Sequence, residues 1–281
     1  MIWSGGRDGF EQIDRENGML NLANGSDRPM KYVYALVPAD SILYAGHSEG
    51  LSLFYDNSWR TLTEADGLPW RTVLAVIASP TSGLWVGTES GLLNMNEHKA
   101  VIHNRSSGMA SDRVFTLCED NQGRIWAGSG PYAQHAGLSM WDGKVWRTYS
   151  VQDGLAHPMV NHIYQARSGD IWFATGFSSR GGASRFDGRT WTTFTQKDGL
   201  PADHSRYIFE DSLGGLWIGS ESAGITRFFE GSTRTFSVED GLAGLEVKAM
   251  MEDSRGSLWL GTERGLTRID APAWKTPSWN N

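Results

Sequence analysis

The sequence contains a single cysteine, Cys118, so no disulfide bond can form within the chain. It also contains no run of about 18 apolar residues, which is the length that a membrane-spanning helix requires. The opening residues, MIWSGGRDGF, lack a basic segment followed by an apolar one, so no signal peptide is visible. We therefore expect no insertion into a membrane.

Positive charge is in short supply as well. The chain has 25 Lys and Arg residues against 32 Asp and Glu residues, which gives a formal net charge of −7 at pH 7. A protein with this balance is poorly suited to the phosphate backbone of nucleic acids or to an anionic membrane surface. We therefore expect no nucleic-acid partner.

Motifs for catalysis and cofactor binding are missing too. The sequence has no GxSxG, no HExxH and no Walker-type phosphate loop. Its repeated Asp-Gly pairs lack the alternating oxygen ligands and the twelfth-position Glu of a calcium-binding EF-hand. The histidines of the central region show neither helical i,i+4 spacing nor a CxxC partner. We therefore expect no metal and no cofactor.

What the sequence has in abundance is glycine, tryptophan and one repeated phrase. The phrase reads LWVGTESGL at 84–92 and LWLGTERGL at 258–266. Its aromatic residue recurs at intervals of 41, 41, 41, 46, 45 and 42 residues, at Trp3, Tyr44, Trp85, Trp126, Trp172, Trp217 and Trp259. A period of about 40–45 residues with several short strands is typical of propeller blades.

Each repeat divides into four short strands, which we call a to d in chain order. In the fourth repeat these are 114–120, 124–129, 137–141 and 144–150. The pattern predicts an all-β fold, a single seven-bladed β-propeller of four-stranded antiparallel blades. We expect one domain over residues 1–281, with blades at about 1–31, 32–72, 73–113, 114–159, 160–204, 205–246 and 247–281.

The first repeat differs from the others. Strand a begins twelve residues before the repeated aromatic elsewhere, but Trp3 leaves no room for such a strand. We therefore expect blade one to lack its innermost strand, unless upstream residues of a longer chain supply it.

The repeated aromatics are expected to build the fold. A tryptophan in strand b projects from the sheet and can pack against the neighbouring blade, which removes about 150–250 Å² from water. At about 25 cal/mol per Å², this contributes at most about 4–6 kcal/mol for each residue. The glycine that follows allows close approach of the backbone. Function should therefore lie where the repeats differ.

The repeated segments resemble a known family. MMEDSRGSLWLGTERGLTRID (250–270) and WTTFTQKDGLP (191–201) are similar to the two-component regulator propeller repeat. In that family, tandem propellers commonly form the extracytoplasmic sensing part of bacterial hybrid sensor kinases, often for polysaccharide-derived ligands. The resemblance implies a sensing role, a carbohydrate ligand and a periplasmic or extracellular location.

The repeats differ mainly in the loop that joins strands b and c. Gly87 and Gly91 are four residues apart across this loop, whereas Gly128 and Gly137 are nine apart. The two long loops are GSGPYAQHAG (128–137) and ATGFSSRGG (174–182). In propellers the b–c loops and the d–a connections share one face, and insertions on one face often form the binding loops.

We therefore expect this face to bind a small polar ligand or a glycan. Its aromatic, amide and cationic side chains suit a sugar or a small anion. The candidate ligand-binding residues are Tyr132, His135, Phe177, Arg180, Asn161, His162, His204, Arg206, Tyr207, Lys248, Trp70, Arg71 and Arg113.

The sequence leaves three alternatives open. One is a propeller lyase or hydrolase with a His, Tyr and Arg site at the channel mouth, for which His162 with Tyr207, or His204 with Glu246, would supply acid and base. Another is a platform that binds a protein or further domains of a longer chain. The third is a solvated rim without a ligand.

Overall fold

The computed structural model describes the chain except for residues 1, 14–19, 23–29, 97–98, 179 and 276–281. The chain divides into two compact units. The N-terminal unit consists of Met1–Ala127, Ala133–His135 and Ser139–Arg147, and the C-terminal unit consists of Gly128–Tyr132, Ala136–Leu138 and Thr148–Asn281.

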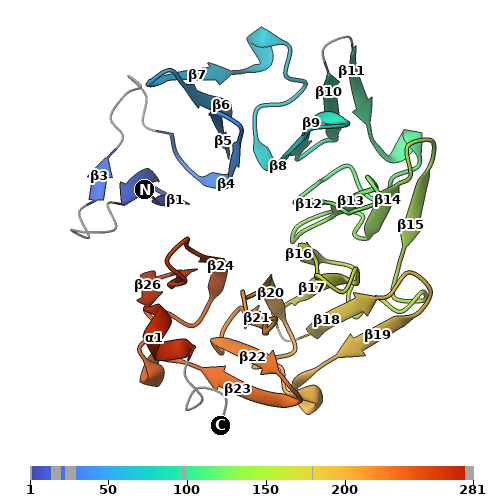
Figure 1. The fold of residues 1–281 in the computed structure, drawn as a ribbon. Coiled ribbons are helices and arrows are strands. Elements are labelled where there is room, and N and C mark those ends of the chain that lie inside the picture. The colour runs from blue at the N-terminus through green and yellow to red at the C-terminus, as the bar shows by residue number, and fades with distance from the viewer. Residues whose placement is uncertain (1, 14–19, 23–29, 97–98, 179, 276–281) are drawn as a thin grey trace. The chain divides into compact units, whose positions relative to one another are not determined.

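The N-terminal unit begins with three antiparallel strands, β1 (Ile2–Gly6), β2 (Gly9–Ile13) and β3 (Leu20–Leu22). A four-stranded sheet follows, with β4 (Val33–Ala39), β5 (Ile42–His47), β6 (Gly50–Tyr55) and β7 (Ser58–Leu62). The next sheet contains β8 (Val73–Ser79), β9 (Gly83–Thr88), β10 (Leu92–Asn96) and β11 (Lys99–His103). Strands that are consecutive in the chain lie side by side within each sheet (Figure 1).

A further sheet contributes residues to both units and contains β12 (Thr116–Glu119), β13 (Ile125–Gly128), β14 (Leu138–Trp141) and β15 (Trp146–Tyr149). The first sheet wholly within the C-terminal unit contains β16 (Val160–Gln165), β17 (Ile171–Phe177), β18 (Arg180–Phe186) and β19 (Trp191–Phe194).

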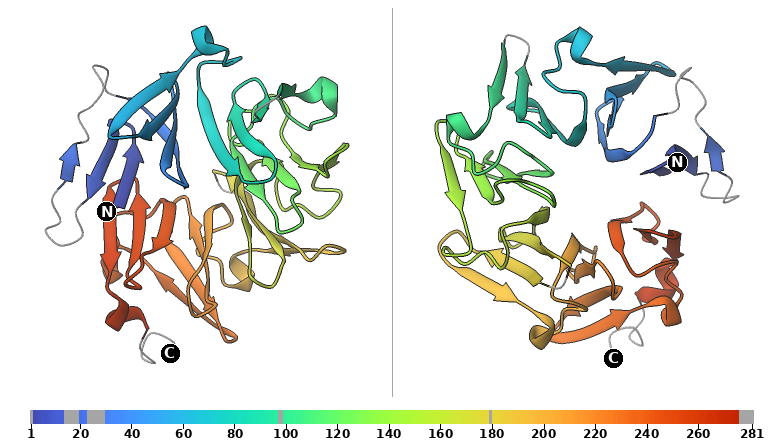
Figure 2. Two further views of the ribbon diagram at one scale, coloured as in Figure 1. Left: turned by 45° about the horizontal axis from the view of Figure 1, so that its top comes forward. Right: turned by 180° about the vertical axis from the view of Figure 1, so that it is seen from behind.

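The C-terminal unit continues with β20 (Ser205–Glu210), β21 (Leu216–Ser220), β22 (Ile225–Phe229) and β23 (Ser232–Phe236). Its last sheet has three strands, β24 (Val247–Glu252), β25 (Leu258–Thr262) and β26 (Gly265–Ile269), and the short helix α1 (Ala271–Trp274) follows it. The same hairpin order is visible from two further directions in Figure 2.

The predicted number of seven blades is wrong, because the structure shows six. Six sheets begin with an innermost strand a, namely β4, β8, β12, β16, β20 and β24. The N-terminal sheet β1–β2–β3 has no strand in this place among the described residues. The repeated aromatic marks strand b of each repeat. Trp3 has the position of such an aromatic, but it lies in the three-stranded sheet β1–β2–β3 and not in a complete blade. The fold is an all-β propeller whose complete blades are four-stranded antiparallel sheets.

An aspartate at the end of strand a joins the repeated turn to the repeated tryptophan. Asp211 accepts hydrogen bonds at Oδ1 from the backbone N–H groups of Leu213 and Gly215, both at 2.9 Å. Its other oxygen, Oδ2, accepts the indole N–H of Trp217 at 2.8 Å. The same bond joins Asp120 to Trp126 at 2.7 Å and Asp253 to Trp259 at 3.0 Å.

The glutamate that precedes this aspartate bonds to the preceding sheet. Glu119 accepts the Ser79 hydroxyl at 2.8 Å, and Glu210 accepts the backbone N–H of Arg167 at 2.8 Å. Glu252 likewise accepts the backbone N–H of Ser212 at 2.7 Å. In the repeated Glu-Asp pair, the aspartate therefore fixes its own blade, and the glutamate links that blade to its neighbour.

The repeated Asp-Gly-Leu sequence forms a capped turn between strand d and the next strand a. At 63–68, the Asp66 carboxylate accepts the backbone N–H of Thr63 at 3.0 Å, and Gly67 adopts the left-handed φ of 95°. Leu68 is then buried. One-turn 3₁₀ helices of this kind occur at Glu64–Asp66, Arg105–Ser107, Gln196–Asp198 and Val238–Asp240.

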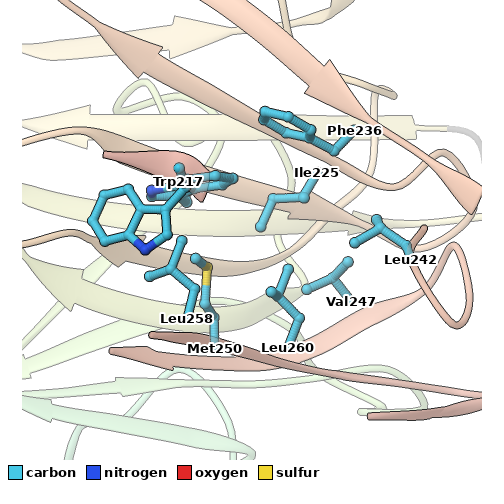
Figure 3. Packing of buried hydrophobic residues seen from close by; sticks show 9 residues of the cluster. Trp217, Ile225, Phe236, Leu242, Val247, Met250, Leu258 and Leu260 are labelled. Carbon is cyan, nitrogen blue, oxygen red and sulfur yellow. The ribbon is translucent and has the colours of Figure 1, made fainter. Parts of the chain in front are cut away.

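Trp85, Trp172 and Trp217 of strand b each lie in a hydrophobic cluster, and Figure 3 shows the cluster that contains Trp217. Trp217 is fully buried and stacks on Phe236 with ring centroids 5.4 Å apart. Met250 and Leu260 contribute to the same cluster from the following sheet. Trp274 of α1 belongs to the same cluster and donates its indole N–H to the carbonyl of Gly256 at 2.8 Å.

We expect Asp211→Ala to lower the free energy of unfolding by about 3–5 kcal/mol. The substitution leaves the buried guanidinium of Arg227, whose Nε lies 2.8 Å from Asp211 Oδ2, without its carboxylate. Urea denaturation followed by tryptophan fluorescence measures the change. Asp187→Ala, in the exposed turn between β18 and β19, is the control and should cost much less. Equal losses would contradict the importance of the buried Asp211 carboxylate.

Candidate functional site

The two long b–c loops bring two exposed aromatic rings together within the C-terminal unit. The rings of Tyr132 and Phe177 meet edge to face, with centroids 5.8 Å apart. Tyr132 is 79% exposed and Phe177 is 36% exposed. Tyr132 and Ser178 have left-handed φ values of 67° and 64°, which are costly for residues with a side chain and tend to occur at functional sites.

Arg180 lies beside this aromatic pair. It pairs with Phe177 at the end of the β17–β18 hairpin, its side chain is exposed, and it forms no ion pair among the residues that the structure describes. Burial, and in second place the charge of Arg180, lower the pKa of His157. Two exposed aromatic rings and an exposed arginine therefore lie on the two long loops, with Arg180 directly opposite Phe177 in the hairpin.

The other predicted cations are balanced by glutamates. In the C-terminal unit, Arg206 Nη2 lies 2.6 Å from Glu246 Oε1, and Lys248 Nζ lies 3.2 Å from Glu246 Oε2. In the N-terminal unit, Arg113 Nη1 lies 2.8 Å from Glu89 Oε1, and Arg71 pairs with Glu49. These cations are less available to a ligand than Arg180.

A β-bulge recurs at the second residue of the innermost strands. The pairing register shifts between Ser205 and Tyr207, and equivalent shifts occur in β4, β8, β16 and β24. The residues within these shifts are Tyr34, Leu74, Asn161, Arg206 and Lys248. A bulge leaves one residue out of the ladder and redirects its side chain. Three of the predicted site residues, Asn161, Arg206 and Lys248, therefore occupy equivalent bulge positions.

Asn161 uses its bulged position to connect strands. Its side chain is buried, and Nδ2 donates to the carbonyl of Gly176 at 2.8 Å and to that of Ser205 at 2.9 Å. These two bonds join β16 to β17 and to β20. Asn161 therefore positions the backbone next to Phe177.

His162 and Tyr207 stack closely, with ring centroids 3.9 Å apart and planes inclined by 25°. His162 Nδ1 accepts the backbone N–H of Ile208 at 3.3 Å, so the neutral ring carries its proton on Nε2. Burial lowers the pKa of His162 to about 3. Burial also raises the pKa of Tyr207 to about 12. At neutral pH both side chains are uncharged.

The remaining predicted residues have separate surroundings. His204 Nε2 lies 2.9 Å from the Ser222 hydroxyl, so Ser222 rather than Glu246 is its partner. Trp70 packs against Gly91, where a Cβ atom would lie 2.5 Å from the indole ring. His135 is exposed and belongs to the N-terminal unit, as do Trp70, Arg71 and Arg113.

Sequence reasoning placed Glu246 with His204 and missed the repeated glutamate that lies between strands b and c. The phrases TESG (88–91) and TERG (262–265) both place a glutamate two residues before the glycine of strand c. Glu89 pairs with Arg113, whereas Glu263 accepts the backbone N–H of Glu246 at 2.9 Å. The repeated glutamate is visible in the sequence, but its partner is not.

Neither a metal site nor a membrane span appears in the described part of the chain. No three His, Cys, Asp or Glu side chains there lie close enough to hold a metal ion. No helix in the same residues is long and apolar enough to cross a membrane.

Comparison with known families identifies the repeats. Residues 108–130, 199–222 and 241–264 match the two component regulator propeller family. Each matched segment contains one of the three bonded pairs, Asp120–Trp126, Asp211–Trp217 or Asp253–Trp259. The chain carries two-component regulator propeller repeats. The resemblance inferred from the sequence is therefore confirmed. No significant match to a curated protein sequence was found.

Solved structures with a similar fold include an extracellular domain. The extracellular domain of BT3049 from B. thetaiotaomicron, assigned to a hybrid two component system, is 20% identical with a TM-score of 0.81. The alignment covers 98% of this chain and 38% of that one. The chain thus resembles such a domain in fold and spans well under half of that chain's length.

Two other similar structures have different roles. PorZ, a surface component of the type-IX secretion system of Porphyromonas gingivalis, is 14% identical with a TM-score of 0.67, over 88% of this chain and 39% of PorZ. Virginiamycin B lyase from Staphylococcus aureus is 16% identical with a TM-score of 0.65, over 86% of this chain and 82% of the lyase. Identities this low establish the shared fold alone.

We expect His162 to make stability depend on pH. Its pKa is about 3 in the folded protein against 6.5 for a free histidine, so the unfolded chain binds an extra proton between these values. Stability should therefore fall as the pH falls below 6.5, by about 1 kcal/mol per pH unit for this group. Urea denaturation should show that the free energy of unfolding of His162→Phe falls less between pH 6.5 and pH 4.5 than that of the wild type.

Tyr207→Phe is the matched control, because it alters the stacked partner and leaves the imidazole in place. It should retain the pH dependence of the wild type. His47, whose pKa burial lowers to about 4, contributes to the slope in all three proteins. Identical slopes for the wild type and His162→Phe would contradict the assignment.

Proposed function

We propose that this propeller is a ligand-binding or sensing module that recognises a carbohydrate or another small polar ligand. Its main support is the cluster formed by Tyr132, Phe177 and Arg180, in which two exposed rings meet edge to face beside a guanidinium without an ion pair among the described residues. The three side chains come from the loops that depart from the repeat period.

The chemistry of the cluster suits a sugar ring. Aromatic faces pack against the apolar C–H faces of a pyranose, and a guanidinium offers five N–H donors to hydroxyl or carboxylate oxygens. The bonds that Asn161 makes to Gly176 and Ser205 hold the backbone next to Phe177 in place before a ligand arrives. This reduces the entropy lost on binding.

The resemblance to the extracellular domain of a hybrid two component system supports a sensing role. In that role, ligand binding by this propeller would be passed to further domains of a longer chain. The corresponding location is periplasmic or extracellular. The chain covers 38% of that structure.

An enzymatic role has weaker support. General acid–base catalysis is most efficient when the catalytic pKa lies near the working pH. The pKa of His162 is about 3 and that of Tyr207 is about 12, so this pair is poorly tuned for proton transfer at neutral pH. The similarity to virginiamycin B lyase concerns the fold and supplies no catalytic group.

A screen of glycans by thermal shift tests the proposal. At least one glycan should raise the melting temperature of the wild type, since a ligand that binds only the folded state stabilises it. Tyr132→Ala and Arg180→Ala should each lower the affinity for that glycan by about tenfold, which corresponds to about 1.4 kcal/mol of binding free energy. The melting temperature without ligand should hardly change, because both side chains are exposed.

Arg189→Ala, in the exposed β18–β19 turn of the same sheet, is the control for Arg180→Ala and should bind like the wild type. If both loop variants retain full affinity for the stabilising glycan, its site lies elsewhere. If no glycan stabilises the protein but Tyr132→Ala abolishes the binding of a protein partner, the loops form a protein-interaction surface.

A further inference from the structure

We infer that the N-terminal unit carries a second ligand site, in which the exposed rings of Tyr34 and Tyr32 bind an uncharged sugar ring beside the Glu89–Arg113 ion pair. This site is separate from the Tyr132–Phe177–Arg180 cluster, and neither tyrosine was a candidate from the sequence. Its existence does not depend on the proposed function of that cluster.

The first observation is the register of β4. Val33 pairs with His47 and Ala35 pairs with Gly46, so Tyr34 is the residue left out of the ladder. This is the position that Arg206 and Lys248 occupy in β20 and β24. Tyr34 is 47% exposed, whereas Val33 beside it is buried. The bulge therefore directs a large aromatic ring toward solvent.

The second observation is the backbone of Tyr32. Its φ of 50° is left-handed, a conformation that bulky residues rarely adopt without compensation. The backbone N–H of Tyr32 donates to the carbonyl of Arg7 at 3.0 Å, and the Arg7 guanidinium lies 5.9 Å from the ring centroid. With Tyr32 42% exposed, these contacts hold a second ring at the surface two residues from the first.

Charged groups complete the surroundings. Burial raises the pKa of Tyr34, the negative charge of Glu89 raises it further and the charge of Arg113 opposes them, so both side chains lie near the phenol. Glu89 and Arg113 form an ion pair at 2.8 Å, so their two charges balance each other. The guanidinium of Arg7 lies over the ring of Tyr32.

This combination favours a neutral pyranose over other ligands. Two phenol rings offer flat apolar surface together with hydroxyl groups, and the ion pair offers both donors and acceptors to sugar hydroxyls. An anion would meet Glu89, and a cation would meet Arg113. A protein-binding patch would need a wider apolar surface, whereas charged side chains border this one.

Fluorine NMR of the full chain labelled with 3-fluorotyrosine tests the inference. Tyrosine-to-phenylalanine variants assign the resonances, and the probes are methyl β-D-glucopyranoside, methyl β-D-galactopyranoside and methyl α-D-mannopyranoside. At least one probe should shift the Tyr34 and Tyr32 resonances saturably. Tyr34→Ala should abolish the shift at Tyr32, whereas Tyr55→Ala, on β6, should retain it.

The absence of a saturable shift at Tyr34 with all three pyranosides would overturn the inference. A shift with N-acetyltryptophanamide and with no pyranoside would also overturn it and would indicate a peptide-binding surface. The Tyr132 resonance appears in the same spectra and reports on the C-terminal unit. Failure of the second site can therefore be distinguished from failure of the proposed function.

Discussion

The bond between the carboxylate that ends strand a and the indole of strand b is the interaction on which the β12–β15, β20–β23 and β24–β26 sheets depend. One carboxylate of Asp211 satisfies two turn N–H groups, the Trp217 N–H and the guanidinium of Arg227. It thereby fixes the turn, the register of the hairpin and the orientation of a fully buried ring. Because such a carboxylate is buried, removing it leaves several polar groups without partners.

This arrangement separates structure from function along each blade. In the β12–β15, β20–β23 and β24–β26 sheets, the aspartate of the a–b turn holds the sheet and the glutamate before it bonds to the previous sheet. The opposite ends of the strands are free to vary, and there the b–c loops lengthen and the bulges present different side chains. Tyr34, Arg206 and Lys248 occupy one backbone position yet offer an aromatic ring, a paired guanidinium and an ammonium group. A common backbone can therefore carry several local chemistries.

Much of this scaffold was predictable from the sequence, because repeated phrases report repeated packing. The period, the burial of Trp217 and the long loops around Tyr132 and Phe177 all follow from it. The number of blades was not predicted correctly, because Trp3 lies in the sheet β1–β2–β3, which has no innermost strand among the described residues. Ion pairs such as Glu89–Arg113 join residues far apart in the chain, and a bulge such as that at Tyr34 leaves no mark on the spacing of the repeats.

The central claim is that the repeated residues build the propeller and the divergent b–c loops bind the ligand. Hydrogen–deuterium exchange with and without a stabilising glycan tests this most directly, since it reports on every backbone segment of one sample. We predict added protection in the β13–β14 and β17–β18 connections and no change in the a–b turn at 211–215. Added protection in the a–b turns, with unchanged exchange in both long loops, would contradict the account.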